Sequence, residues 1–157
     1  MSMMGRFRGR QGRAPAAGPD PRDLVRKPLP EGELRIGAIT YCRNEKNFLP
    51  LWIKYYGEQF GLENLYVVDD NSDDGSTDDL PVDVIRVPEI RDGEFNVTRM
   101  SFVGNFGRAL FELYDVLLFC DTDEFVVPDP EKYAGLRDFI ERQPEDTLAV
   151  AAFGLNV

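Results

Sequence analysis

Residues 65–81, LYVVDDNSDDGSTDDLP, join an apolar run to six aspartates, a glycine and a proline. The run at 65–69 is short and bounded by turn residues, which predicts a buried strand. Acidic residues at this density repel one another, so the segment after the strand needs a physical explanation. Three interpretations are open: a calcium loop, a turn that grips a nucleotide, and a well-solvated surface turn.

Strand and helix patterns alternate on both sides of this stretch. Buried strands are predicted at 34–40, 65–69, 82–87, 115–121 and 147–153. A helix is predicted from Leu49 to Gly61, because apolar residues recur there on one face, namely Leu49, Trp52, Ile53, Tyr56 and Phe60. Further helices are predicted over about 97–113 and 135–143. Apolar strands that alternate with helices indicate an α/β fold, a mostly parallel sheet with helices on both faces.

Polar segments follow three of the predicted strands: YCRNEKN at 41–47, DDNSDDGS at 69–76 and DTDE at 121–124. In parallel sheets ligands bind beyond the carboxyl ends of the strands, near the switch in strand order. With the order 3-2-1-4, the first and fourth strands are neighbours, and Cys42 and Cys120 lie close together. We therefore expect the three polar segments to form one site.

Composition narrows the chemistry of that site. The net charge of −10 divides into +5 over residues 1–27 and −15 over the remainder, so the body of the chain does not bind nucleic acid through phosphates. The chain has no histidine, which excludes Ser-His and Cys-His catalysis and favours oxygen ligands, hence Mg, Mn or Ca. Two cysteines are too few for a disulfide scaffold, which indicates a reducing, cytoplasmic location.

The chain divides into a tail and one domain. Residues 1–32 are rich in Gly, Pro, Ala and Arg without hydrophobic periodicity, and we interpret them as a disordered basic tail. The alternative is a basic arm that contacts anionic lipid or RNA, which would place the protein at the inner face of the membrane. Residues 33–157 form the folded domain, and no apolar run is long enough to predict a transmembrane segment.

Two interpretations of the acidic stretch are disfavoured because key positions hold the wrong type of residue. A calcium loop of the EF-hand type that begins at Asp70 needs a glutamate at its twelfth position, which is Pro81. A dinucleotide site of the dehydrogenase type needs Gly-x-Gly-x-x-Gly after the first strand, where bulky Tyr41 and Arg43 stand instead. A nucleotide-sugar site remains: one acid contacts the base or ribose, and Asp121 with Asp123 holds a metal on the diphosphate, both on one side of an extended segment.

The segments TYCRNEKNFLPLWIKYYGEQFGLENLYVVDDNSDDGSTDD and DVLLFCDTDEF together resemble the family 2 glycosyltransferases of the GT-A fold. The similarity covers residues 34–127 and is greatest to the branch with a Trp in the first helix and Glu-Phe after Asp-x-Asp. It implies a Rossmann-like GT-A domain, of which this chain would be the nucleotide-binding half. Glycosyltransferases of this type continue beyond the Asp-x-Asp, and no candidate for the catalytic base precedes Val157.

The resemblance also implies roles for single residues. Asp70 matches the acid that contacts the nucleobase, and Asp121 and Asp123 match the Asp-x-Asp that binds Mg or Mn, with Asp123 favoured for direct contact. The remaining nucleotide-binding residues are expected to be Tyr41, Asn44, Glu45 and Arg99, with Arg108 as an alternative source of positive charge. In the turn itself, Asp69, Ser72 and Asp78 are expected to be structural, and Asp73, Asp74 and Asp79 to be solvated.

The function implied is metal-dependent transfer of a sugar from a UDP- or GDP-sugar to an unknown glycan, lipid or protein acceptor. One alternative is a non-catalytic module that binds a nucleotide sugar or a divalent cation. The other is a sugar nucleotidyltransferase, against which stands the lack of a Gly-rich loop with Arg or Lys after the first strand.

Overall fold

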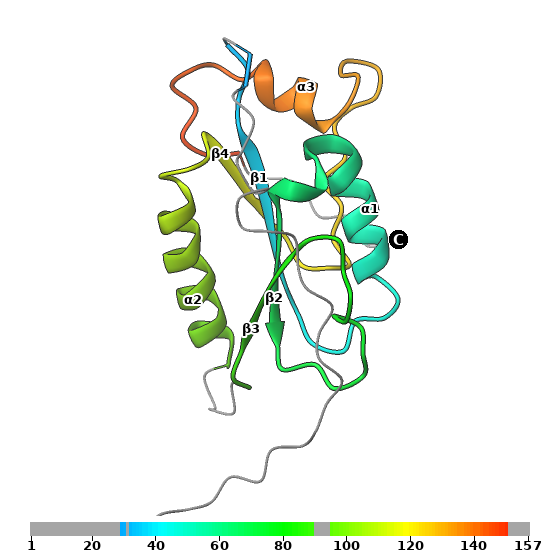
Figure 1. Cartoon of the computed structure of the whole chain (residues 1–157). Helices are drawn as coiled ribbons and strands as arrows, with labels where there is room; N and C mark the ends of the chain where they lie inside the picture. The colour runs from blue at the N-terminus through cyan, green and yellow to red at the C-terminus, as the bar shows by residue number, and fades with distance from the viewer. Residues whose placement is uncertain (1–28, 31, 90–94, 151–157) are drawn as a thin grey trace, which may run out of the picture.

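The structure is a computed structural model that describes residues 29–30, 32–89 and 95–150. Nearly all of the predicted basic tail therefore lies outside the described residues. Within them the chain forms four strands, three α-helices and one short 3₁₀ helix (Figure 1). Strands and helices alternate for most of this length, which confirms the α/β class.

Four strands form one parallel sheet in the order β3-β2-β1-β4, the order under which the sequence places Cys42 and Cys120 close together. Their bounds are β1 Ile36–Cys42, β2 Leu65–Asp70, β3 Asp83–Val87 and β4 Val116–Phe119. The two central strands, β1 and β2, are buried along their whole length. The outer strands, β3 and β4, are only partly buried. The two central strands lack alternating polarity, as expected for a sheet covered on both faces.

Helices cover the two faces of the sheet (Figure 1). On one face α1 (Leu49–Phe60) and α3 (Leu136–Glu141) pack against alternate strand residues such as Ile36, Ala38 and Val67. On the other face α2 (Phe95–Leu110) packs against the intervening residues, among them Ile39 and Val68. Because strand side chains point alternately to the two faces, each strand contributes to both cores.

Helix α1 buries the face that the sequence pattern predicts: Leu49, Trp52, Ile53, Tyr56 and Phe60. Pro50 lies in its first turn, where no backbone donor is needed. Gly61 ends the helix with φ of 89°, a conformation that other residues rarely adopt. The short 3₁₀ helix η1 (Leu62–Asn64) then leads directly into β2.

The structure differs from the sequence-based prediction after β4. This strand ends at Phe119, and residues 122–123 form a turn closed by a hydrogen bond of 3.0 Å from the Glu124 amide to the Asp121 carbonyl oxygen. The predicted fifth strand is not formed over residues 147–150, and residues 151–153 lie outside the described residues. Within the described ranges, no helix is both apolar and long enough to cross a membrane.

Candidate functional site

Three loops meet at the carboxyl end of the sheet, because β1, β2 and β4 are adjacent and parallel. The loops after β1 and β2 lie side by side beyond the arrowhead of β2 (Figure 1). They are joined there by Asn44, whose backbone amide donates a hydrogen bond to Ser72 Oγ at 3.0 Å. The expectation that polar segments at the ends of the first two strands converge is thus supported by a direct contact.

Asn44 and Asp73 exchange two further hydrogen bonds between these loops. The Asn44 side-chain amide donates to Asp73 Oδ1, and the Asp73 backbone amide donates to Asn44 Oδ1, both at 3.0 Å. Asn44 adopts φ of 57°, in the left-handed region that asparagine tolerates. Asp73 is exposed, as expected for a solvated residue, and its side chain and backbone amide also hold the two loops together.

Asp69 is a structural residue, as expected. It is fully buried and accepts hydrogen bonds from the Ser72 amide at 2.8 Å, Thr77 Oγ1 at 3.0 Å and Arg86 Nε at 2.7 Å. Burial acts to raise the pKa of Asp69, but these hydrogen bonds outweigh it and hold the pKa below its ordinary value. Asp74 likewise accepts from the Ser76 amide at 2.9 Å, so it belongs to the folded turn rather than to free surface.

Asp70 has a different environment, because side chains alternate along β2 and it faces α2. Its side chain is fully buried and lies close to the Tyr41 phenol, which is on the same face of the sheet. Burial and the adjacent Asp70 carboxylate raise the pKa of the Tyr41 phenol to about 12, which keeps it protonated. The Asp70 carboxylate is therefore closed to solvent in this structure.

Arg99 connects Tyr41 to the Asp-x-Asp segment. Its guanidinium lies over the Tyr41 ring, 5.9 Å from the centroid, and its Nη1 forms an ion pair of 2.9 Å with Asp121 Oδ1. Contacts thus run from Asp70 through Tyr41 and Arg99 to Asp121, across β2, β1, α2 and the end of β4. This series brings together four of the residues that the sequence singled out.

Arg108, the alternative source of positive charge, lies elsewhere. It is in the last turn of α2, nine residues beyond Arg99, which corresponds to about 14 Å along a helix. Since Arg99 lies near the amino end of α2 and contacts the Asp-x-Asp segment, Arg108 lies toward the amino ends of the strands. Of these two arginines, Arg99 is the one placed to meet a phosphate at the candidate site.

The Asp-x-Asp segment is a turn and not an extended strand. The argument that Asp121 and Asp123 point the same way because side chains alternate along a strand is therefore wrong. Asp121 is partly exposed and paired with Arg99, whereas Asp123 is exposed. Over the described ranges, no group of three acidic, cysteine or histidine side chains could hold a metal ion by itself. Two carboxylate residues still fit Mg²⁺ or Mn²⁺, because such ions are commonly held by one or two carboxylates together with substrate phosphates.

The sequence did not reveal the role of three α1 side chains that contact the segment after β4. Trp52 Nε1 donates to Cys120 Sγ at 3.2 Å, and Tyr55 Oη donates to the Val126 carbonyl oxygen at 2.8 Å. Tyr56 Oη bonds to three atoms of the same segment. Periodicity identifies Trp52 and Tyr56 as core residues, but it carries no information about which loop their polar atoms meet.

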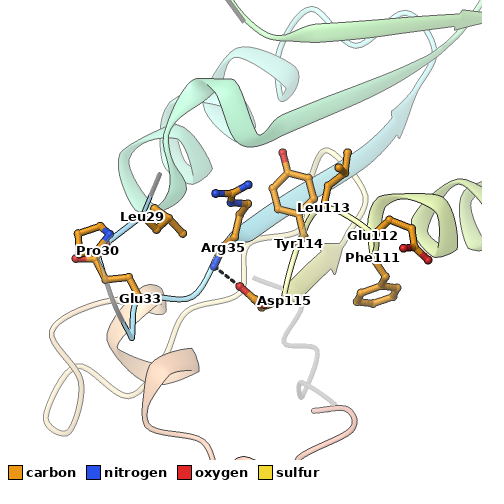
Figure 2. A pocket seen from close by; sticks show the side chains of 9 residues that line it. All are labelled: Leu29, Pro30, Glu33, Arg35, Phe111, Glu112, Leu113, Tyr114 and Asp115. Atoms are coloured by element: carbon orange, nitrogen blue, oxygen red, sulfur yellow. Dashed lines mark hydrogen bonds between the residues drawn. The ribbon is translucent and has the colours of Figure 1, made fainter. Parts of the chain in front are cut away.

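A cavity of about 480 Å³ lies at the other end of the sheet (Figure 2). Tyr114, Asp115 and the residues that precede them form one wall, and Arg35 is its one basic lining residue. The Arg35 backbone amide donates to Asp115 Oδ2 at 2.7 Å across it. It contains none of the residues that the sequence predicts for the site.

Comparisons with known proteins add little beyond the sequence. No model of a known protein family matches the chain, and no curated protein sequence matches it. Among solved structures, the mannosyltransferase PcManGT from Pyrobaculum calidifontis, in complex with GDP-Man and Mn²⁺, matches with a TM-score of 0.42 and 17% identity. The match covers 76% of this chain and 36% of that one, so this chain spans about a third of the length of the protein it matches.

Proposed function

We propose that this chain is the donor-binding part of a metal-dependent glycosyltransferase that uses a UDP- or GDP-sugar. The proposal rests on the resemblance of residues 34–127 to the family 2 glycosyltransferases. The observation that carries it is the series of contacts from Asp70 to Asp121 through Tyr41 and Arg99. Two acids that are far apart in the sequence are thereby linked at the sheet edge where ligands bind in parallel α/β folds.

Each residue has a role that its chemistry supports. Asp70 would accept a hydrogen bond from a base imide or a ribose hydroxyl once Tyr41 moves aside. Arg99 would exchange its ion pair with Asp121 for one with the donor diphosphate, since guanidinium groups bind phosphates well. Asp121 and Asp123 would then hold Mg²⁺ or Mn²⁺, which supplies positive charge to a leaving diphosphate. Asn44 would act by fixing the loop beside the nucleotide, because its side chain is engaged with Asp73.

Calorimetric titration tests the proposal. The chain is titrated with UDP, GDP and their sugar conjugates, with and without Mn²⁺. We expect one nucleotide to bind in a Mn²⁺-dependent way, with binding lost in Asp123→Ala and weakened at least tenfold in Asp70→Ala and Arg99→Met. Asp146→Ala is the matched control, because it removes an exposed carboxylate from the loop after α3 and leaves the sheet edge unchanged.

The outcomes separate the candidate functions. Absence of nucleotide binding by a folded chain would overturn the proposal. Binding in every variant alike would place the nucleotide elsewhere. Binding without transfer to any acceptor, in this chain and in a longer one, would favour the non-catalytic binding module. A triphosphate bound more tightly than the diphosphates would favour the sugar nucleotidyltransferase.

A further inference from the structure

Helix α1 holds the Asp-x-Asp turn through polar atoms as well as by apolar packing. The contacted segment runs from Cys120 to Val126 and contains both Asp121 and Asp123. Trp52 meets it at Cys120, before the two aspartates, and Tyr55 meets it at Val126, after them. Tyr56 meets it on both sides.

The Tyr56 hydroxyl makes three hydrogen bonds to this segment. It donates to the Glu124 carbonyl oxygen at 3.2 Å and accepts from the Val126 amide at 3.0 Å and from Cys120 Sγ at 3.3 Å. A phenol hydroxyl carries one hydrogen and two lone pairs, so all of its capacity is used. One atom therefore fixes the distance between the residue before Asp121 and the residues after Asp123.

The surroundings of Tyr56 keep this hydroxyl in one position. The side chain is fully buried, and its ring lies parallel to that of Phe125, with centroids 6.3 Å apart. Tyr55 packs edge-on against the same Phe125 ring at 5.5 Å. Burial and the contact with Cys120 raise the pKa of Tyr56, so it remains a neutral hydrogen-bond donor.

We propose that Tyr56 is a positioning residue for the candidate metal site, and that its hydroxyl sets the cation affinity of Asp121 and Asp123 by fixing the turn that carries them. The inference rests on the proposed function, because it needs a cation at that turn. Groups that hold metal ligands in place change metal affinity when removed, typically by about 10–100-fold.

The test compares two buried tyrosines. Tyr56→Phe removes the hydroxyl at the turn, and Tyr66→Phe removes a buried hydroxyl that contacts Tyr114 Oη at 3.0 Å on the α2 face, at the other end of the sheet. Mn²⁺ affinity is measured with saturating GDP or UDP from the paramagnetic resonance of free Mn²⁺. Quenching of Trp52 fluorescence by Mn²⁺ provides a second readout, because Trp52 is the single tryptophan and contacts Cys120, next to Asp121. The melting temperature of each variant is recorded in parallel.

We expect Tyr56→Phe to weaken Mn²⁺ binding about 10–100-fold. Tyr66→Phe should lower the melting temperature by about as much as Tyr56→Phe does. It should leave the Mn²⁺ affinity within twofold of the wild type. Equal affinities in Tyr56→Phe and the wild type, or equal losses in both variants, would overturn the inference while the proposed function stands. Absence of Mn²⁺ binding in the wild type would instead overturn the metal-dependent function and the inference with it.

A second variant covers a failure of Tyr56→Phe to fold. Tyr55→Phe removes only the bond to the Val126 carbonyl oxygen, and Tyr55 is half-buried, so the fold should tolerate the change. We expect a smaller loss of Mn²⁺ affinity, about threefold to tenfold. Unchanged affinity in this variant would show that the hold of α1 on the turn does not set cation binding.

Discussion

Asp69 and Asp70 are adjacent in the chain, yet they serve different purposes because they face opposite sides of β2. Asp69 joins the structural turn through Ser72 and Thr77 and takes an ion pair from Arg86 on β3. Asp70 lies on the α2 face beside Tyr41. The direction of each side chain, which the strand period sets, separates the structural acid from the candidate ligand-binding one.

Replacing Arg86 by leucine tests the structural acid. Arg86→Leu removes a charged hydrogen bond to a buried carboxylate, so we expect the free energy of unfolding at pH 7 to fall by about 1–2 kcal/mol, the low end for such bonds because Arg86 is half exposed. Urea denaturation measures the change. The control Arg43→Leu breaks an accessible ion pair with Glu89, and we expect it to lower the free energy of unfolding much less than Arg86→Leu does.

The effect of Arg86→Leu should depend on pH with a definite sign. The folded-state pKa of Asp69 is lowered, so its contribution to stability is present above the unfolded pKa of about 3.9 and is lost as the pH falls through the folded pKa. The difference between wild type and variant should therefore shrink below about pH 4. A difference that stays constant from pH 7 to pH 3 would show that Arg86 stabilises the fold by packing alone.

The two thiols give a further prediction at the residue scale. Cys42 and Cys120 are free and buried, and burial together with nearby Asp69 raises the pKa of Cys42 to about 12. We expect neither thiol to react at pH 8 with a colorimetric disulfide reagent until the chain is unfolded, when two thiols should react. Rapid reaction of a thiol in the native chain would indicate a redox-responsive site at the ends of β1 and β4.

At the scale of elements, the candidate site depends on contacts that hold three loops in place. Asn44 joins the β1 and β2 loops, Arg99 joins α2 to the end of β4, and the tyrosines of α1 hold the Asp-x-Asp turn from the other face. Each of these contacts links segments that are distant in the sequence. A substitution that removes one contact should therefore affect the site without disturbing the central strands.

Two substitutions at Asn44 separate the effect of its side-chain hydrogen bonds from that of its left-handed backbone conformation. Asn44→Ala removes both bonds to Asp73 and puts alanine, which tolerates the left-handed region less well than asparagine, at φ of 57°, so we expect a loss of about 1–3 kcal/mol in the free energy of unfolding. Asn44→Gly removes the same bonds but adopts this φ freely, and its loss should be smaller. Urea denaturation of both variants measures the difference; an equal or greater loss in Asn44→Gly would show that the left-handed backbone costs alanine nothing here.

At the scale of the whole molecule, the β4 edge of the sheet lies beside an apolar groove. Among the described residues β4 pairs only with β1, and a shallow apolar groove of about 220 Å³ lies between it and α2. Met100 and Phe111 line this groove and are each about half exposed, at 48% and 56%. An exposed strand edge beside an apolar surface favours association between chains.

We therefore expect self-association of the chain at high concentration, which sedimentation velocity measures. The double variant Met100→Lys/Phe111→Lys should remain monomeric over the same range, with its free energy of unfolding changed by less than about 1 kcal/mol because both positions are on the surface. Lys54→Met, which adds an apolar side chain to the exposed face of α1, controls for general surface hydrophobicity and should not change the association. Association that persists in the double lysine variant would place the contact on another surface.

The fold class and the buried face of α1 can be predicted from the amino-acid sequence alone. These features follow from local periods: apolar residues at helical spacing from Leu49 to Phe60, and short apolar runs such as Leu65–Asp70, whose patterns need no knowledge of distant residues. The rule that parallel strands present ligands at their carboxyl ends then predicted where Asp70 and Asp121 would lie.

Which polar atoms meet became clear from the three-dimensional arrangement of the chain. It showed that Asp73 fastens two loops, that the Asp-x-Asp segment is a turn, and that Tyr56 holds that turn. Over residues 147–150 it also showed no strand, although the apolar run predicts one. The physical reason is common to all four: hydrogen bonds and strand pairing between segments far apart in the chain depend on where the backbone places each partner, and no local period of residue types records that placement.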